Sequence, residues 1–232
     1  MTLSSAEWEA IRLSLLIGLA AVVWILPLGI GVAWLLARHE FRGKALLDGL
    51  IHLPLVLPPV VVGYLLLLSL GRQSIIGQWL YTTFGVALPF TWQGATVACG
   101  VMAFPLLVRA LRLSLEAVDP KLETAASTLG SSRWRVFATI TLPLAMPGLL
   151  TGTVLAFARA LSEFGATITF ASNIPGETRT LPLSLYSLIQ SPGQESAAAR
   201  LCLIAIAIAL VSLMASEWLA RRTRQRLQER DG

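Results

Sequence analysis

Long windows without a charged residue set the pattern of this chain. The windows 13–37, 49–71 and 136–158 contain 25, 23 and 23 residues, none of them charged. Each exceeds the roughly 20 residues that a helix needs to cross about 30 Å of hydrocarbon. Each window therefore predicts one membrane-spanning helix.

Two further spans follow from less regular windows. The window 73–108 is broken by Gly77, Gly85 and Pro89, so we expect a loop and then a span from about residue 91. The window 201–220 is interrupted only by Glu217. An open sheet cannot satisfy its backbone in lipid, and no alternating barrel pattern occurs. The sequence predicts an all-α integral membrane protein, one domain over 1–232, with five transmembrane helices at about 13–37, 49–70, 91–110, 138–160 and 198–219.

Composition agrees with a bilayer and orients the chain in it. Charged residues make up 13% of the 232 residues, whereas a soluble domain carries about 25%. Basic residues accumulate in short cytoplasmic loops, and 13 of the 18 lie in segments 38–48 and 109–135 and in the tail 221–230. We expect these segments inside, with the N-terminus outside and the C-terminus inside. Topology thus explains the net charge of +5, and no nucleic acid partner is expected.

The sequence contains no complete catalytic or metal-binding motif. The segment HEFRG at 39–43 begins like the zinc motif HExxH, but Gly43 occupies the place of the second histidine. The sole GK pair lacks the first glycine and the Ser or Thr of a phosphate-binding loop. No glycine-flanked serine accompanies His52. We therefore expect no enzyme, no metal and no cofactor in this chain, and energy for uphill transport must come from another chain or an ion gradient.

The segment 119–143 interrupts the apolar pattern with a short amphipathic helix, expected at about 120–130. Asp119 is suited to cap this helix, Pro120 to occupy its first position and Gly130 to end it. Four residues repeat at i, i+3, i+4 and i+7 and form one apolar stripe: Leu122, Ala125, Ala126 and Leu129. The stripe either packs on its own protein or docks into a groove of a partner, and the pattern leaves both open.

The same segment resembles the EAA loop of importer-type ABC transporter permeases. The resemblance implies a coupling helix that fits a cleft in the ATPase subunit. In the family a glutamate stands six residues before the glycine, where this chain has Thr124, and Glu123 stands one position earlier. The residues that the resemblance assigns to ATPase coupling are Glu123, Thr124, Ala125, Ala126, Leu129, Gly130, Ile140, Leu142 and Pro143.

Longer stretches resemble the permease subunits of molybdate importers in particular. They include FRGKALLDGLIHLPLVLPPVVVGYLLLLSLG at 41–71, RALSEFGATITFASNIPGETRTLPLSLYSLIQ at 159–190 and SEWLARR at 216–222. The resemblance implies a homodimer of permeases in the bacterial inner membrane, with the N-terminus periplasmic. It also implies two ATP-binding cassette subunits, which bind ATP and Mg²⁺, and a periplasmic molybdate-binding protein. The alternatives are another oxyanion, tungstate or sulfate, or an ATP-independent channel or ion-coupled carrier.

Proline, glycine and polar residues inside the spans are candidates for the translocation pathway. Pro58, Pro59 and Gly63 interrupt the second span, which is tolerable in lipid only where neighbours or water satisfy the freed carbonyls. Arg159 and Glu163, four residues apart, form either a structural ion pair or a site for a tetrahedral dianion. The candidates are Pro58, Pro59, Gly63, Arg159, Ser162, Glu163 and Thr167.

Two other features bear on packing and docking. Gly148, Gly152 and Ala156 repeat every four residues, a small-residue face that serves either packing within the subunit or a dimer seam. The outer loop 171–196 is too long for an unstructured link, so we expect a short helix at about 181–190. Its exposed position suits docking of the external binding protein.

Overall fold

The protein is all-α in the computed structural model, which describes residues 3–228, with no strand among them. For part of 216–228 only the backbone is described, and Arg230 of the basic tail lies outside the described residues. The elements are α1 (Ser5–Arg38), α2 (Lys44–Val56), α3 (Pro59–Leu70), α4 (Ile75–Phe84), α5 (Trp92–Glu116), α6 (Pro120–Thr128), α7 (Arg133–Val136), the π-helix η1 (Phe137–Thr141), α8 (Leu142–Leu144), α9 (Met146–Leu161), α10 (Gly165–Phe170), α11 (Leu181–Ile189) and α12 (Glu195–Gln228).

Among residues 3–228, three helices are long and apolar enough to cross a membrane unbroken, and two bent pairs supply up to two more spans. The unbroken helices are α1, α5 and the 195–215 part of α12. The bent pairs are α2 with α3, at 117°, and α7–α8 with α9, at 69°. Five spans result when each bent pair counts as one. The structure therefore agrees with an all-helical membrane protein of five spans, and it shows that two of them are not straight.

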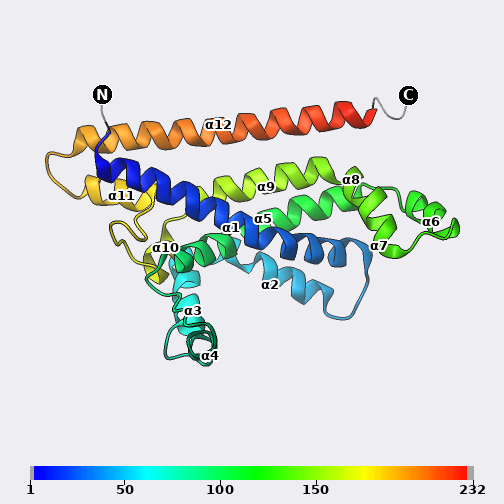
Figure 1. Ribbon diagram of the computed structural model, residues 1–232, viewed down its shortest axis with the longest axis horizontal. Coiled ribbons are helices and arrows are strands. Elements are labelled where there is room, and N and C mark those ends of the chain that lie inside the picture. Colours follow the sequence, from blue (N-terminus) through cyan, green and yellow to red (C-terminus); the bar gives the residue numbers. More distant parts are fainter. Residues whose placement is uncertain (1–2, 229–232) are drawn as a thin grey trace.

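The core of the bundle lies where α5 packs between α1 and α9 (Figure 1). Its largest buried side chains include Ile17 and Leu36 of α1 and Leu107 and Leu115 of α5, each at most 2% exposed. Gly152 allows α9 to approach closely, because a Cβ there would lie 3.0 Å from Ala110 of α5. The small-residue face of the fourth span thus serves packing within the subunit.

The second span differs in form from the single helix expected at 49–70. Its first half, α2, ends at Val56, and α3 begins after Pro58 with Pro59 at its first position. Pro59 cannot donate a backbone hydrogen bond, so the helical ladder is not continued across this point. The 117° bend turns α3 out of the bundle direction, and α3 with α4 projects away from the long helices (Figure 1).

Helix α4 lies in the first part of the window 73–108, where the glycines and the proline predict a loop. Ser74 caps it by accepting a hydrogen bond from the Gly77 amide, and Gly85 ends it in the left-handed conformation at φ 68°. Gly77 packs directly against the Gly71 backbone, leaving no room for a Cβ. The helix-breaking glycines that suggested a loop instead act as a close contact and a C-terminal stop.

The start of α1 and the C-terminal part of α12 lie at opposite ends of the bundle (Figure 1). Helix α12 runs along the length of the molecule beside α9, and its second turn is tied to α1 by an ion pair in which Arg200 Nη2 lies 3.0 Å from Glu7 Oε1. The expected short helix at about 181–190 is confirmed as α11. Helix α6 and the C-terminal end of α1 lie at the same end as the C-terminal part of α12 (Figure 1).

Candidate functional site: coupling helix and helix break

Local sequence signals account for the position and length of α6. Asp119 caps the helix by accepting a hydrogen bond from the Lys121 amide, and Pro120 occupies the first position. The helix ends at Thr128, and Gly130 follows at φ +84°, a conformation that glycine adopts without the Cβ penalty. Ser132 then caps α7 by accepting from the Arg135 amide. The expected short helix is therefore present, with the expected caps.

The apolar stripe of α6 is not packed on its own protein. Leu122 is 48% exposed and Leu129 is 86% exposed. Ala125 is exposed as well, while Ala126 is half-buried. On the adjoining α7, Trp134 is 82% exposed. Helix α6 contains no buried residue at all. Together these side chains leave an open apolar surface at one end of the bundle.

Glu123 points into the bundle. Its Oε1 accepts hydrogen bonds from Arg38 Nη2 at 2.8 Å and from Thr141 Oγ1 at 2.7 Å. The neighbouring Thr124 is exposed, and its hydroxyl donates to the Pro120 carbonyl within the same helix. Thr124, at the family's glutamate position, therefore points to solvent, and Glu123 is held by its own chain.

The segment Ile140–Pro143 carries the chain from α7 into the long helix α9. Ile140 lies in η1, and Leu142 and Pro143 lie in α8; all three side chains are half-buried. Thr141 between them is 1% exposed. The bend follows at Ala145, where α8 ends and α9 begins.

Arg159 and Glu163 form an ion pair at the junction between α9 and α10. Arg159 Nη1 lies 2.6 Å from Glu163 Oε2, and the Glu163 side chain is 1% exposed. Its other oxygen, Oε1, accepts a hydrogen bond from the Ala166 amide at 2.8 Å. The two residues were expected to continue along one helix, but α9 ends at Leu161 and Glu163 lies in the break. Glu163 therefore joins the end of α9 to the start of α10.

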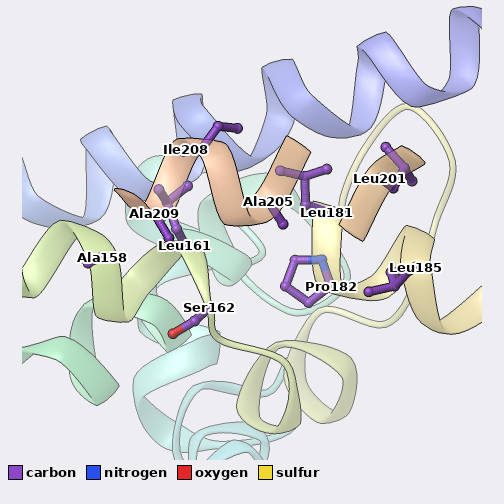
Figure 2. Close-up of a pocket in the computed structure, with 10 residues that line it drawn as sticks. All are labelled: Ala158, Leu161, Ser162, Leu181, Pro182, Leu185, Leu201, Ala205, Ile208 and Ala209. Atoms are coloured by element: carbon purple, nitrogen blue, oxygen red, sulfur yellow. The ribbon is translucent and has the colours of Figure 1, made fainter. Parts of the chain in front are cut away.

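The other polar candidates of this span have different surroundings. Thr167 is fully buried, with its Oγ1 3.6 Å from Cys99 Sγ. Ser162 is exposed, and its hydroxyl donates to the Arg159 carbonyl. Ser162 lies at the edge of a groove of about 240 Å³ between α9, α11 and α12 (Figure 2). Leu161, Pro182 and Ala205 are among the apolar side chains that line this groove (Figure 2). A dianion would find no charged partner there.

The break in the second span and the break after α9 meet in space. A Cβ on Gly63 would lie 2.7 Å from the Ala166 carbonyl oxygen, and a Cβ on Gly165 would lie 2.7 Å from Pro59 Cβ. The predicted residues Pro59 and Gly63 are thus packed against the segment that Glu163 caps. Pro58 itself is exposed on the outer side.

Several residues of these sites were missed by the sequence analysis. Arg38 appears in the sequence only as one basic residue among many, and Thr141 only as the residue between Ile140 and Leu142. Arg38 and Glu123 are 85 positions apart. Their pairing depends on how α1 packs against the rest of the bundle, and no local pattern carries that information.

Comparison with known proteins agrees with the arrangement just described. Residues 25–225 match the family model of the binding-protein-dependent transport system inner membrane component. The chain is 64% identical over 226 residues to the molybdenum transport system permease protein of Escherichia coli strain K12, covering 97% of this chain and 99% of that protein. It is 61% identical over 221 residues to the Haemophilus influenzae protein of the same name, covering 95% and 96%.

Among solved structures, the fold is similar to that of a bacterial ABC transporter involved in the import of the acidic polysaccharide alginate. The TM-score is 0.75 at 17% sequence identity, over 95% of this chain and 80% of that one. The chain belongs to the family of binding-protein-dependent transport system inner membrane components.

Proposed function

We propose that this chain is the membrane-spanning permease subunit of an ATP-driven ABC importer for molybdate. The observation that carries the proposal is the 64% identity to a molybdenum transport permease over 97% of the chain. The helices α1, α5 and α12 and the two bent pairs make it a multi-pass protein of the inner membrane. The chain is not catalytic by itself, because the ATPase activity of this family lies in a separate subunit.

Coupling to ATP passes through α6 in this proposal. The exposed stripe of Leu122, Ala125 and Leu129 presents small and apolar side chains that a cleft of the ATPase subunit covers. Covering them removes apolar area from water, which is favourable at about 25 cal/mol per Å². ATP and Mg²⁺ are bound by that subunit, and we propose that two copies of it serve one transporter.

The transport pathway is proposed to run between two copies of the chain. Within one copy, the junction after α9 is filled, since Glu163 and Thr167 are at most 1% exposed. The bend of the second span is exposed instead: Pro58 is exposed, and Val56, two residues earlier, is 83% exposed. A homodimer that brings these breaks together places the interrupted backbone along a water-lined path, which is where it is tolerated in a membrane. The ion pair of Arg159 and Glu163 then stabilises the helix junction that lines this path.

The basic residues orient the proposed transporter. The end of the bundle with α6, the Arg38 end of α1 and the C-terminal part of α12 is cytoplasmic, and the end with the start of α1 and α11 is periplasmic (Figure 1). The loop 171–196 at the periplasmic end receives the binding protein. Selectivity for the anion resides mainly in that binding protein, because a strongly binding site in the permease would hinder release.

Competitive uptake tests this function. Vesicles that contain the chain, its ATPase subunit and its molybdate-loaded binding protein are given labelled molybdate with ATP. We expect uptake that excess tungstate reduces and excess sulfate leaves largely unchanged. If sulfate competes as well as molybdate, the chain belongs to a general oxyanion importer. Uptake that proceeds without ATP would refute the proposal of an ATP-driven importer.

A further inference from the structure

Helix α6 is connected to the membrane helices by very few side chains. It contains no buried residue, and its contacts with other elements are chiefly those with its chain neighbours α7 and η1. A surface hollow of about 530 Å³ lies between it and the end of α1, lined by residues such as Trp34, Arg133 and Phe137. Apart from the backbone, few contacts can therefore transmit a movement of the exposed stripe to the membrane helices.

Glu123 bridges this hollow. Its Oε1 accepts from Arg38, in the last turn of α1, and from Thr141, at the end of η1. The Arg38 and Glu123 side chains are 14% and 23% exposed, so the pair is largely shielded from water. Arg38 Nη2 also donates to the Val118 carbonyl at 3.2 Å, just before α6 begins. One carboxylate thus connects α6 to the first span and to the start of the fourth.

Thr141 behaves differently from the other threonines near it. The hydroxyls of Thr139, Thr151 and Thr153 donate to the carbonyl four residues earlier on their own helices. Thr141 donates across to Glu123 instead, from a π-helical turn. Such turns are rare and occur frequently at functional sites. Of the two threonines in this turn, Thr139 donates back to Arg135, and only Thr141, at its end, donates across to α6.

We propose that Arg38, Glu123 and Thr141 form an internal clamp that makes α6 move as one unit with the ends of the first and fourth spans. Glu123 is a positioning residue: it acts on the membrane helices, and the surface that meets the ATPase is the exposed stripe of α6. Charge-assisted hydrogen bonds suit this role, since they are about twice as strong as neutral ones. This inference rests on the proposed function, because the clamp is of use only where α6 is pushed by a partner.

The test uses the full complex with Glu123→Ala, Glu123→Gln and Thr141→Val. Thr141→Val removes only the hydroxyl at nearly constant shape. We expect each variant to copurify with the ATPase subunit as the unsubstituted chain does, while molybdate carried per ATP hydrolysed falls by about tenfold in Glu123→Ala. The charge-exchanged double variant Arg38→Glu/Glu123→Arg should recover part of that ratio. Glu40→Gln is the matched control, because the exposed Glu40 pairs only with Lys44, four residues later at the start of α2, and joins no two helices.

Two results would overturn the clamp. Loss of copurification in Glu123→Ala with an unchanged Thr141→Val would make Glu123 a contact to the ATPase. An unchanged transport ratio in Glu123→Ala would remove the coupling role. Backbone hydrogen exchange keeps this test separate from the proposed function: Glu123→Ala should raise exchange in α6 and η1 even in a complex that carries no molybdate, and equal exchange would show that no clamp exists.

Discussion

The ion pair between Arg159 and Glu163 gives a prediction that separates a structural role from contact with the transported anion. Glu163 is 1% exposed and uses both oxygens, one for Arg159 and one for the Ala166 amide. Replacing Arg159 with Met leaves a buried carboxylate without its counter-charge, which costs about 3–5 kcal/mol. In a chain of this size that corresponds to a fall of roughly 10 °C in the unfolding midpoint.

The double variant Arg159→Met/Glu163→Gln should lose less than Arg159→Met alone. The Gln oxygen can still accept from the Ala166 amide, and no unpaired charge remains, so we expect a net loss of about 1–2 kcal/mol. The double variant should therefore lose about 1–4 kcal/mol less than Arg159→Met alone, and any cost of Glu163→Gln by itself adds to the coupling between the two positions. Unfolding of the purified complex in detergent, followed by tryptophan fluorescence, measures all four corners of this cycle.

Uptake in the same variants completes the comparison. If the pair is structural, molybdate uptake in the double variant follows the amount of assembled complex. If the loss of stability in the double variant equals the sum of the losses in the two single variants, the pairing argument is refuted. A stable, fully assembled double variant that carries no molybdate would contradict the structural role and assign the pair to the pathway.

Three further predictions concern the surfaces of the fold. Leu129→Asp, on a side chain 86% exposed, should abolish copurification with the ATPase subunit while the chain keeps its unfolding midpoint, and undiminished copurification would exclude the stripe as the docking surface. A Val side chain at Gly148 has no room against Ser114, so Gly148→Val should lower the free energy of unfolding by about 1–3 kcal/mol. Gly31→Ala, with nothing near its Cβ, is the control in the same thermal assay. Equal unfolding midpoints in the two variants would contradict close packing of α9 on α5. The third prediction uses a chain with Cys202→Ser as background. A short bifunctional maleimide should crosslink Val56→Cys to the same residue of a second copy, whereas Leu203→Cys on α12 should not be crosslinked. A monomer in both variants would contradict pairing through the second span.

Local signals in the sequence were sufficient for the helices whose ends they mark. Asp119, Pro120 and Gly130 fix α6 because capping and the left-handed stop are properties of neighbouring residues. Pro58 and Pro59 marked a break for the same reason, but the 117° angle depends on how α3 packs against α10. The glycines around α4 were interpreted as a loop, although Gly77 is required there for close contact with Gly71.

Contacts between distant residues could not be predicted. Glu7 and Arg200 are 193 positions apart, and Arg38 and Glu123 are 85 positions apart, so no periodicity relates them. Glu163 was recognised as a buried acid with a partner, but its role as the cap of α10 requires knowing that α9 ends before it. The sequence thus indicated which residues were unusual, and the packing of the helices determined what they contact.

The central claim is that this chain transports molybdate only when an ATPase drives it. The most direct measurement is uptake of labelled molybdate into vesicles, compared between the chain alone and the complete complex with binding protein, each with and without ATP. The account predicts accumulation only in the complete complex with ATP. Accumulation by the chain alone, with no ATP, would contradict it.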